Sequence, residues 1–250
     1  MIRTLFLIFT ITFFGCHQQS NTNLTIATAA NMQFAMEELI PAFTEETGIA
    51  CETIFSSSGK LTAQIMEGAP FDVFLSADMK YPNMLHNEGL STIPPKIYAY
   101  GQIVLWTQVD GIVPSIDILT EDYIKHIAIP NPKTAPYGKS AFEMLEYHGL
   151  LEKVKNKLVY GESIAQTNQF INSKATEIGF TAKSVVLSPK MRDLGKWVDV
   201  KKGTYKPISQ GIVLLNSHES KRENAQKFYD FLFSTKGKEI LNKFGYSVTE

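Results

Sequence analysis

Short apolar runs alternate with helical patterns from Leu24 onward. The first runs are LTIATAA (24–30), ETIFSSS (52–58) and FDVFLSAD (71–78), and after each one apolar residues recur at helical spacing. A strand, a helix and a further strand in succession form the βαβ unit of a parallel sheet, so this region predicts one α/β lobe. Pro41 lies within the first helical segment and is expected to kink it or to begin a second short helix, because proline lacks an N–H.

The same alternation returns in the middle of the chain. Its apolar runs are HIAIPNP (126–132), KLVYGES (157–163) and IGFTAKS (178–184), and a helical pattern follows the first two. Because the order of strand and helix is unchanged, these runs predict a second lobe built in the same way as the first.

Two longer apolar runs separate and reunite these regions. They are IYAYGQIVLWTQ at 97–108 and PISQGIVLL at 207–215. Each is long enough to leave one lobe and enter the other. The predicted fold class is therefore α/β, with two parallel-sheet lobes joined by two crossover strands and hinged around a cleft. Lobe 1 is expected at 24–102 and 208–250, and lobe 2 at 103–207.

The first sixteen residues have a different character. One Arg precedes an apolar run, Thr4 to Gly15, that is too short to span a membrane comfortably and has the form of a secretory signal. The pair Gly15 and Cys16 is similar to the cleavage box of bacterial lipoproteins, in which the Cys is lipidated and becomes the new N-terminus. An ordinary signal peptide with an incidental Cys is the alternative. Residues 17–23 are polar and suit a tether. We therefore expect a periplasmic protein anchored to a membrane through lipid.

Composition excludes several kinds of site. If Cys16 is lipidated, Cys51 is the one remaining thiol, and no intrachain disulfide can form. The five His residues lie far apart without the spacing of metal ligands, so no free metal cation is expected. The formal net charge is −1 with acids and bases interspersed, which leaves no basic stripe for nucleic acid.

Candidate chemistry is concentrated in four turns between a strand and a helix. They lie at 29–31, 56–59, 135–138 and 161–164 and consist largely of small residues and hydrogen-bond donors. Ligands of open α/β sheets bind at this end of the strands, where helix N-termini present free N–H groups to anions. Two turns come from each lobe, so we expect them to converge on a small, fully ionised oxyanion. Ser58 taken alone is better explained as a plain helix N-cap, and it is the repetition of such turns in both lobes that favours a ligand.

The stretch SSSGK at 56–60 is not the end of a phosphate-binding P-loop. That motif requires Gly at position 54 and Ser or Thr at position 61, and this chain has Ile54 and Leu61. The physics of an anion at a helix start remains applicable without the motif.

Taken together, the segments resemble the periplasmic molybdate-binding proteins of ABC transporters. The resemblance is carried by ATAANM, FSSSGKLTAQIMEGAPFDVFLSAD, NPKTAPYGKSA, GESIAQTNQF and EIGFTAKS, and it extends from Leu24 to the C-terminal helices. It implies the type II periplasmic binding protein fold. It also implies a monomeric binding protein without enzymatic activity or cofactor, which captures molybdate or tungstate in the interlobe cleft and delivers it to an ABC permease.

The resemblance also assigns ligand contacts to the four turns. They are Ala30, Asn31, Ser58, Gly59, Ala135 or Tyr137, and Ile164, through backbone N–H groups and hydroxyls. Some members of the family place a Tyr hydroxyl where this chain has Ala182. The set of donors is then smaller, or it is completed elsewhere, for instance by Thr181 or Ser163.

Three other functions agree with part of the sequence. Sulfate or another oxyanion is the related alternative, because the same donors would serve it. A serine hydrolase using Ser57 or Ser58 lacks a G-x-S-x-G motif and a nearby His. A sensing domain of a regulator shares the architecture but does not explain the signal peptide. Asp72 and Asp78 are expected to cap turns and hold the cleft wall, since a carboxylate pair would repel a dianion.

Overall fold

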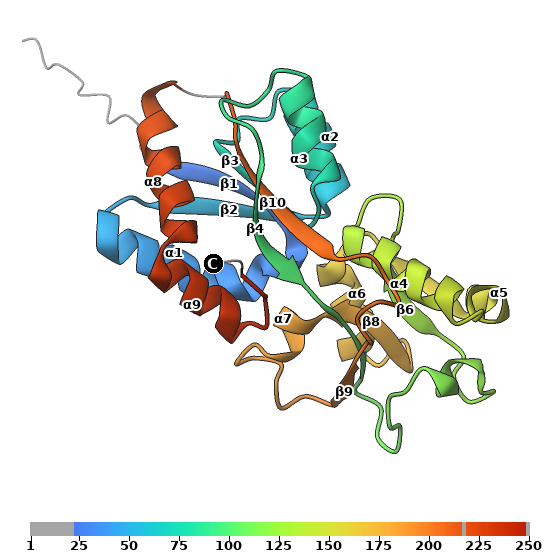
Figure 1. The fold of residues 1–250 in the computed structure, drawn as a ribbon. Helices are drawn as coiled ribbons and strands as arrows, with labels where there is room; N and C mark the ends of the chain where they lie inside the picture. The colour runs from blue at the N-terminus through green and yellow to red at the C-terminus, as the bar shows by residue number, and fades with distance from the viewer. Residues whose placement is uncertain (1–22, 217–218, 249–250) are drawn as a thin grey trace, which may run out of the picture.

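The computed structural model describes residues 23–216 and 219–248. The expected signal peptide, the lipidated Cys16 and residues 17–22 of the tether lie outside this part of the chain. The described residues form two five-stranded sheets, each covered by helices (Figure 1). Within these ranges, no helix is both long enough and apolar enough to cross a membrane.

The first sheet has the strand order β2-β1-β3-β10-β4. Its strands are β1 (Leu24–Ala29), β2 (Cys51–Ser56), β3 (Val73–Ser76), β4 (Lys96–Gly101) and β10 (Ile208–Leu214). One face is covered by α2 (Ser58–Met66) and α3 (Lys80–Asn87), and the other by α1 (Gln33–Thr47), α8 (Arg222–Phe233) and α9 (Thr235–Lys243) (Figure 1). The residues buried under α2 and α3 form a hydrophobic cluster separate from the main core.

The second sheet has the order β7-β6-β8-β5-β9. Its strands are β5 (Ile103–Thr107), β6 (Ile127–Pro130), β7 (Leu158–Gly161), β8 (Ile178–Ala182) and β9 (Lys196–Asp199). Its helices are α4 (Pro136–Tyr147), α5 (Leu151–Val154), α6 (Ile164–Asn172) and α7 (Lys183–Val186). Short 3₁₀ turns are η1 (Ala30–Met32), η2 (Asp117–Thr120), η3 (Lys155–Lys157) and η4 (Glu219–Lys221).

The chain passes between the sheets at the two places expected from the long apolar runs. The first run is divided at Gln102 into β4 and β5, one in each sheet. After β9 the chain returns to the first sheet, where β10 begins with Ile208 paired to Gly101. The crossings therefore lie side by side, as hinge strands must if the lobes are to move about them (Figure 1).

The sheets are mixed, whereas parallel sheets were expected. The strands β1, β2 and β3 run parallel, as do β6, β7 and β8, but β10 is antiparallel to β3 and β5 is antiparallel to β8. The reason is the direct crossing. A strand that leaves one sheet at its cleft edge enters the other at the edge where the βαβ strands end, so it must run against them.

The first helix is continuous, so Pro41 does not begin a second helix. Pro41 lies inside the continuous helix α1, which ends at Gly48 in the left-handed conformation. The proline is exposed, while Leu39 and Phe43 on either side of it are fully buried. Their burial against the sheet keeps the helix in place despite the missing N–H.

Candidate functional site

The four predicted turns meet around one small cavity between the sheets. Its volume is about 10 Å³, close to the space that a single water molecule needs. The lining residues are Ala29, Ala30, Asn31, Ser56, Ser57, Ser58, Ala77, Ala135, Pro136, Tyr137 and Ile164. All sequence-predicted contacts except Gly59 are among them. The cleft is thus closed, and a tetrahedral oxyanion would require its walls to move slightly apart.

Helix starts form most of this lining. Helix α2 begins at Ser58, α4 at Pro136 and α6 at Ile164. The backbone N–H groups of Ser58, Tyr137 and Ile164 have no acceptor among the described residues, as is normal in a first helical turn. Together with the helix dipoles, these N–H groups give the cavity a positive potential without a cationic side chain.

Ser58 is fully buried and positioned to donate. Its Oγ accepts a hydrogen bond from the Ala77 N–H at 3.0 Å. Because a hydroxyl has one hydrogen and two lone pairs, this contact leaves the Ser58 hydrogen free for the cavity. The N-cap alternative for Ser58 is wrong, because Ser58 is the first residue of α2 and Ser57 occupies the cap position.

Asn31 belongs to a buried polar network behind the cavity. Its Nδ2 donates to Gln210 Oε1 and to the Tyr246 hydroxyl, each at 2.9 Å. Its carbonyl oxygen accepts from Ser184 Oγ at 2.8 Å and from the Tyr246 hydroxyl at 2.9 Å. Since both amide hydrogens are used, the backbone N–H is the group of Asn31 that remains available to a ligand.

Tyr137 directs its ring into the same network. Its hydroxyl accepts from Gln210 Nε2 at 3.2 Å. A Cβ added at Gly101 would lie 2.1 Å from that hydroxyl, so this position requires glycine. Burial raises the pKa of Tyr137 well above its usual value, and the neighbouring Tyr246 and Tyr98 raise it further. The phenol therefore stays protonated. Because its hydroxyl bonds Gln210, Tyr137 contributes its backbone N–H to the cavity.

Two residues of the expected contact set, Ala135 and Gly59, have backbone N–H groups that are already occupied. The N–H of Ala135 donates to Asn131 O at 2.8 Å, which leaves Tyr137 as the donor of that turn. The N–H of Gly59 donates to Thr134 O in the other lobe at 2.9 Å. A Cβ on Gly59 would lie 3.0 Å from Thr134 Cα. Gly59 was expected to allow a ligand to approach; in the structure it allows the opposite lobe to do so.

Further contacts hold the lobes together beside Gly59. The Tyr81 hydroxyl donates to Lys133 O at 3.3 Å, and Lys60 forms an ion pair with Glu162. The ion pair is exposed, so its contribution is small.

This chain has Ala182 where some relatives have a Tyr hydroxyl. Thr181 and Ser163 were expected to supply the missing donor, and neither residue lines the cavity. Thr181 Oγ1 donates to Asn168 Oδ1 at 2.5 Å, and Ser163 Oγ accepts from the Gln166 N–H at 3.4 Å as the cap of α6. Ser56 and Ser57 also line the cavity, and the buried hydroxyl of Ser57 has no partner among the described residues. Sequence reasoning missed it as a contact, along with the supporting residues Gln210 and Tyr246, which no local motif marks.

The family model for bacterial extracellular solute-binding proteins matches residues 24–247. The chain belongs to this family. It is 37% identical over 236 residues to the molybdate-binding protein ModA of Azotobacter vinelandii, covering 94% of this chain and 93% of that protein. It is also 37% identical over 226 residues to ModA of Rhodobacter capsulatus, covering 90% of this chain and 87% of that protein.

The fold of this solute-binding protein agrees with that of a solved relative. The periplasmic molybdate-binding protein of Azotobacter vinelandii matches it with a TM-score of 0.86 at 33% identity, covering 91% of this chain and 100% of the other. The two-lobed binding-protein fold and the family resemblance are confirmed. Membership of this family also confirms the prediction that the chain is a solute-binding protein and not an enzyme.

The two aspartates of the solute-binding protein have separate roles. Asp72 is buried before β3, where its carboxylate accepts from the Thr25 N–H at 2.8 Å and pairs with Lys221 at 3.4 Å. That end of the strand is opposite the cavity, so the expected place in the cleft wall is wrong for Asp72. Asp78 accepts from the Tyr81 N–H at 3.3 Å at the start of α3. Burial raises its pKa.

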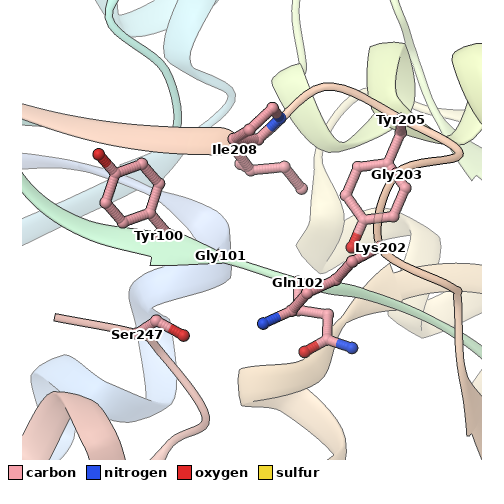
Figure 2. Close-up of a pocket in the computed structure, with 9 residues that line it drawn as sticks. Tyr100, Gly101, Gln102, Lys202, Gly203, Tyr205, Ile208 and Ser247 are labelled. Atoms are coloured by element: carbon pink, nitrogen blue, oxygen red, sulfur yellow. The ribbon is translucent and has the colours of Figure 1, made fainter.

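A larger cavity of about 300 Å³ lies at the hinge, and none of the predicted contacts lines it. Figure 2 shows Tyr100 and Gln102 from the first crossing together with Lys202, Tyr205 and Ile208 near the second. No helix begins at any of its lining residues, so it lacks the converging N–H groups of the smaller cavity. Among the described residues, no group of His, Cys, Asp or Glu could hold a metal ion.

Proposed function

We propose that this protein captures molybdate, and tungstate as well, in the small interlobe cavity and delivers the anion to an ABC permease. The observation that carries the proposal is the convergence of N–H groups from Ser58, Tyr137 and Ile164 on one cavity that two lobes enclose. Binding would shift the two lobes toward their closed arrangement, which is a hinge motion.

The chemistry of the lining supports a dianion. No charged side chain lines the cavity. Its free groups are backbone N–H groups and hydroxyls, which can all donate to a fully ionised oxyanion. A phosphate that keeps a proton would need a carboxylate acceptor there, and the lining has none.

The names of the relatives support the choice of molybdate over other dianions. Two relatives at 37% identity, each aligned over most of its length, are molybdate-binding proteins. The solved relative is described as periplasmic, which supports the same compartment here. We further propose a monomer tethered by a lipid on Cys16, with residues 24–102 and 208–250 as one lobe and 103–207 as the other.

Isothermal titration of the full chain, purified in mild detergent, tests the function. Molybdate, tungstate and sulfate are each added in a buffer otherwise poor in oxyanions. We expect one-to-one binding of molybdate and tungstate and no heat from sulfate. Binding of sulfate alone would overturn the named ligand and keep the oxyanion site, whereas no binding of any of the three would overturn the site itself.

A further inference from the structure

Ser57 has a buried hydroxyl without a hydrogen-bond partner. The residue is 3% exposed, and its Oγ has no hydrogen-bond partner among the described residues. Ser57 lines the small interlobe cavity. Buried hydroxyls in native proteins are nearly always paired, so an unpaired one next to a cavity requires an explanation.

The usual role of a serine at this position does not supply that explanation. Ser57 is the N-cap residue of α2, with the extended backbone (φ −72°, ψ 149°) that N-caps adopt, but its side chain makes no capping bond. A cap accepts from the second or third N–H of its helix. The second N–H of α2 is that of Gly59, and it donates instead to Thr134 O across the cleft. Because the Gly59 N–H is bonded to the other lobe, it is not available to the Ser57 hydroxyl.

The neighbouring Ser58 shows the contrast. Its Oγ accepts from the Ala77 N–H at 3.0 Å, so its oxygen has a partner in the protein alone. The Ser57 Oγ has no such partner among the described residues, and the residue lines the cavity, so a ligand there could satisfy its hydroxyl. A hydroxyl beside free backbone N–H groups matches a ligand that accepts hydrogen bonds on every side.

Three other buried hydroxyls also lack a partner among the described residues, namely those of Thr28, Thr134 and Thr176. None of them lines the cavity. Thr176 precedes β8, at the end of that strand away from the cleft, and is 1% exposed. It therefore provides a matched control for removing an unpaired buried hydroxyl.

We infer that the Ser57 hydroxyl is a direct donor to the bound oxyanion, in addition to the contacts carried over from the family. This inference rests on the proposed function and adds a residue to the same site. Ser57 would remain unpaired in the empty closed protein and become satisfied when a tetrahedral oxyanion occupies the cavity.

The test compares Ser57→Ala, Thr176→Val and the unchanged full chain in detergent, each titrated with molybdate and each unfolded with urea. Ser57→Ala is expected to weaken molybdate binding by about 10- to 100-fold, as for a hydrogen bond to a charged partner. Its urea midpoint without molybdate is expected to be unchanged or higher, because an unsatisfied group has been removed. Thr176→Val is expected to leave the affinity unchanged.

Molybdate affinity equal to that of the unchanged chain in Ser57→Ala would overturn the inference and leave the oxyanion site standing. Absence of binding by the unchanged chain would instead overturn the proposed function, so the two failures are distinguishable. If Ser57→Ala does not fold, Ser57→Gly removes the same hydroxyl from an extended backbone and is judged by the same affinity criterion.

Discussion

Gln210 donates a hydrogen bond from Nε2 to the hydroxyl of Tyr137 at 3.2 Å, which links the second crossover strand to the first turn of α4 in the other lobe. The Oε1 of the same amide accepts from Asn31 Nδ2 and from the Tyr98 hydroxyl, each at 2.9 Å. One side chain at the hinge thus orients cavity-lining residues from both lobes. The contact with Tyr137 joins the two lobes, whereas those with Asn31 and Tyr98 lie within lobe 1, so Gln210 couples the geometry of the cavity to closure through Tyr137.

Replacement of Gln210 by Leu tests this coupling. The change leaves Asn31, Tyr98 and Tyr137 without their buried partner, so the free energy of unfolding should fall by about 1 to 3 kcal/mol. Molybdate binding should weaken as well, because the first turns of η1 and α4 lose their support. Urea unfolding and calorimetric titration measure the two effects. Gln226→Leu in α8 is the control, because among the described residues that amide bonds only Asp230, at the surface, and it should have little effect on either. Equal behaviour of the two variants would contradict the role of Gln210.

Ser58→Ala should lower both affinity and stability. The variant loses a donor to the oxyanion, which should cost about 1 to 3 kcal/mol of binding. It also leaves the Ala77 N–H unpaired, so the urea midpoint without ligand should fall. The fall in midpoint distinguishes Ser58 from Ser57. Unchanged affinity in a folded Ser58→Ala protein would remove Ser58 from the site.

Gly59→Ala should favour the open arrangement of the lobes. The new Cβ would lie 2.7 Å from the Tyr81 hydroxyl and 3.0 Å from Thr134 Cα, both closer than such contacts normally allow. We expect a larger radius of gyration by small-angle X-ray scattering and weaker molybdate binding. Adding Tyr81→Phe removes the nearer atom and should partly restore compactness. A compact Gly59→Ala protein with full affinity would show that this contact does not limit closure.

The hinge network should make stability sensitive to alkaline pH. Burial raises the pKa of Tyr246 from 10.0 to about 12. The unfolded chain releases this proton at lower pH than the folded protein does, so the stabilisation is complete below pH 10 and is lost as pH rises toward 12. We expect the difference in unfolding free energy between the unchanged chain and Tyr246→Phe to shrink across that interval. A constant difference would contradict the raised pKa.

Cys16→Ser tests the proposed lipid anchor. The substitution removes the thiol that would be acylated, so the protein should move from the membrane fraction to the soluble extracytoplasmic fraction. Fractionation followed by immunoblotting measures the shift. Cys51→Ser is the matched control, because Cys51 lies in β2 and should not affect the anchor. Persistent membrane association of Cys16→Ser would contradict the lipoprotein proposal.

Local patterns predicted the elements and the four turns of the candidate site, and the family resemblance named the contacts within those turns. Asn31, Ser58, Tyr137 and Ile164 were placed at helix starts because small and hydrogen-bonding residues after a buried strand favour that turn, and the structure brings all four to one cavity. Strand direction was less predictable. The antiparallel pairing of β5 and β10 follows from where the crossing strands enter each sheet, which no local run of residues specifies.

The sequence by itself determined the alternation of strands and helices, the positions of the turns and the two crossings, because each depends on residues close together in the chain. Only the tertiary structure decided which groups at those turns are free. The N–H of Gly59 is taken by Thr134 and the amide of Asn31 by Gln210, partners that are distant in sequence. A hydrogen-bond donor can serve one strong acceptor at a time, so its availability to a ligand depends on what the folded chain has already placed beside it.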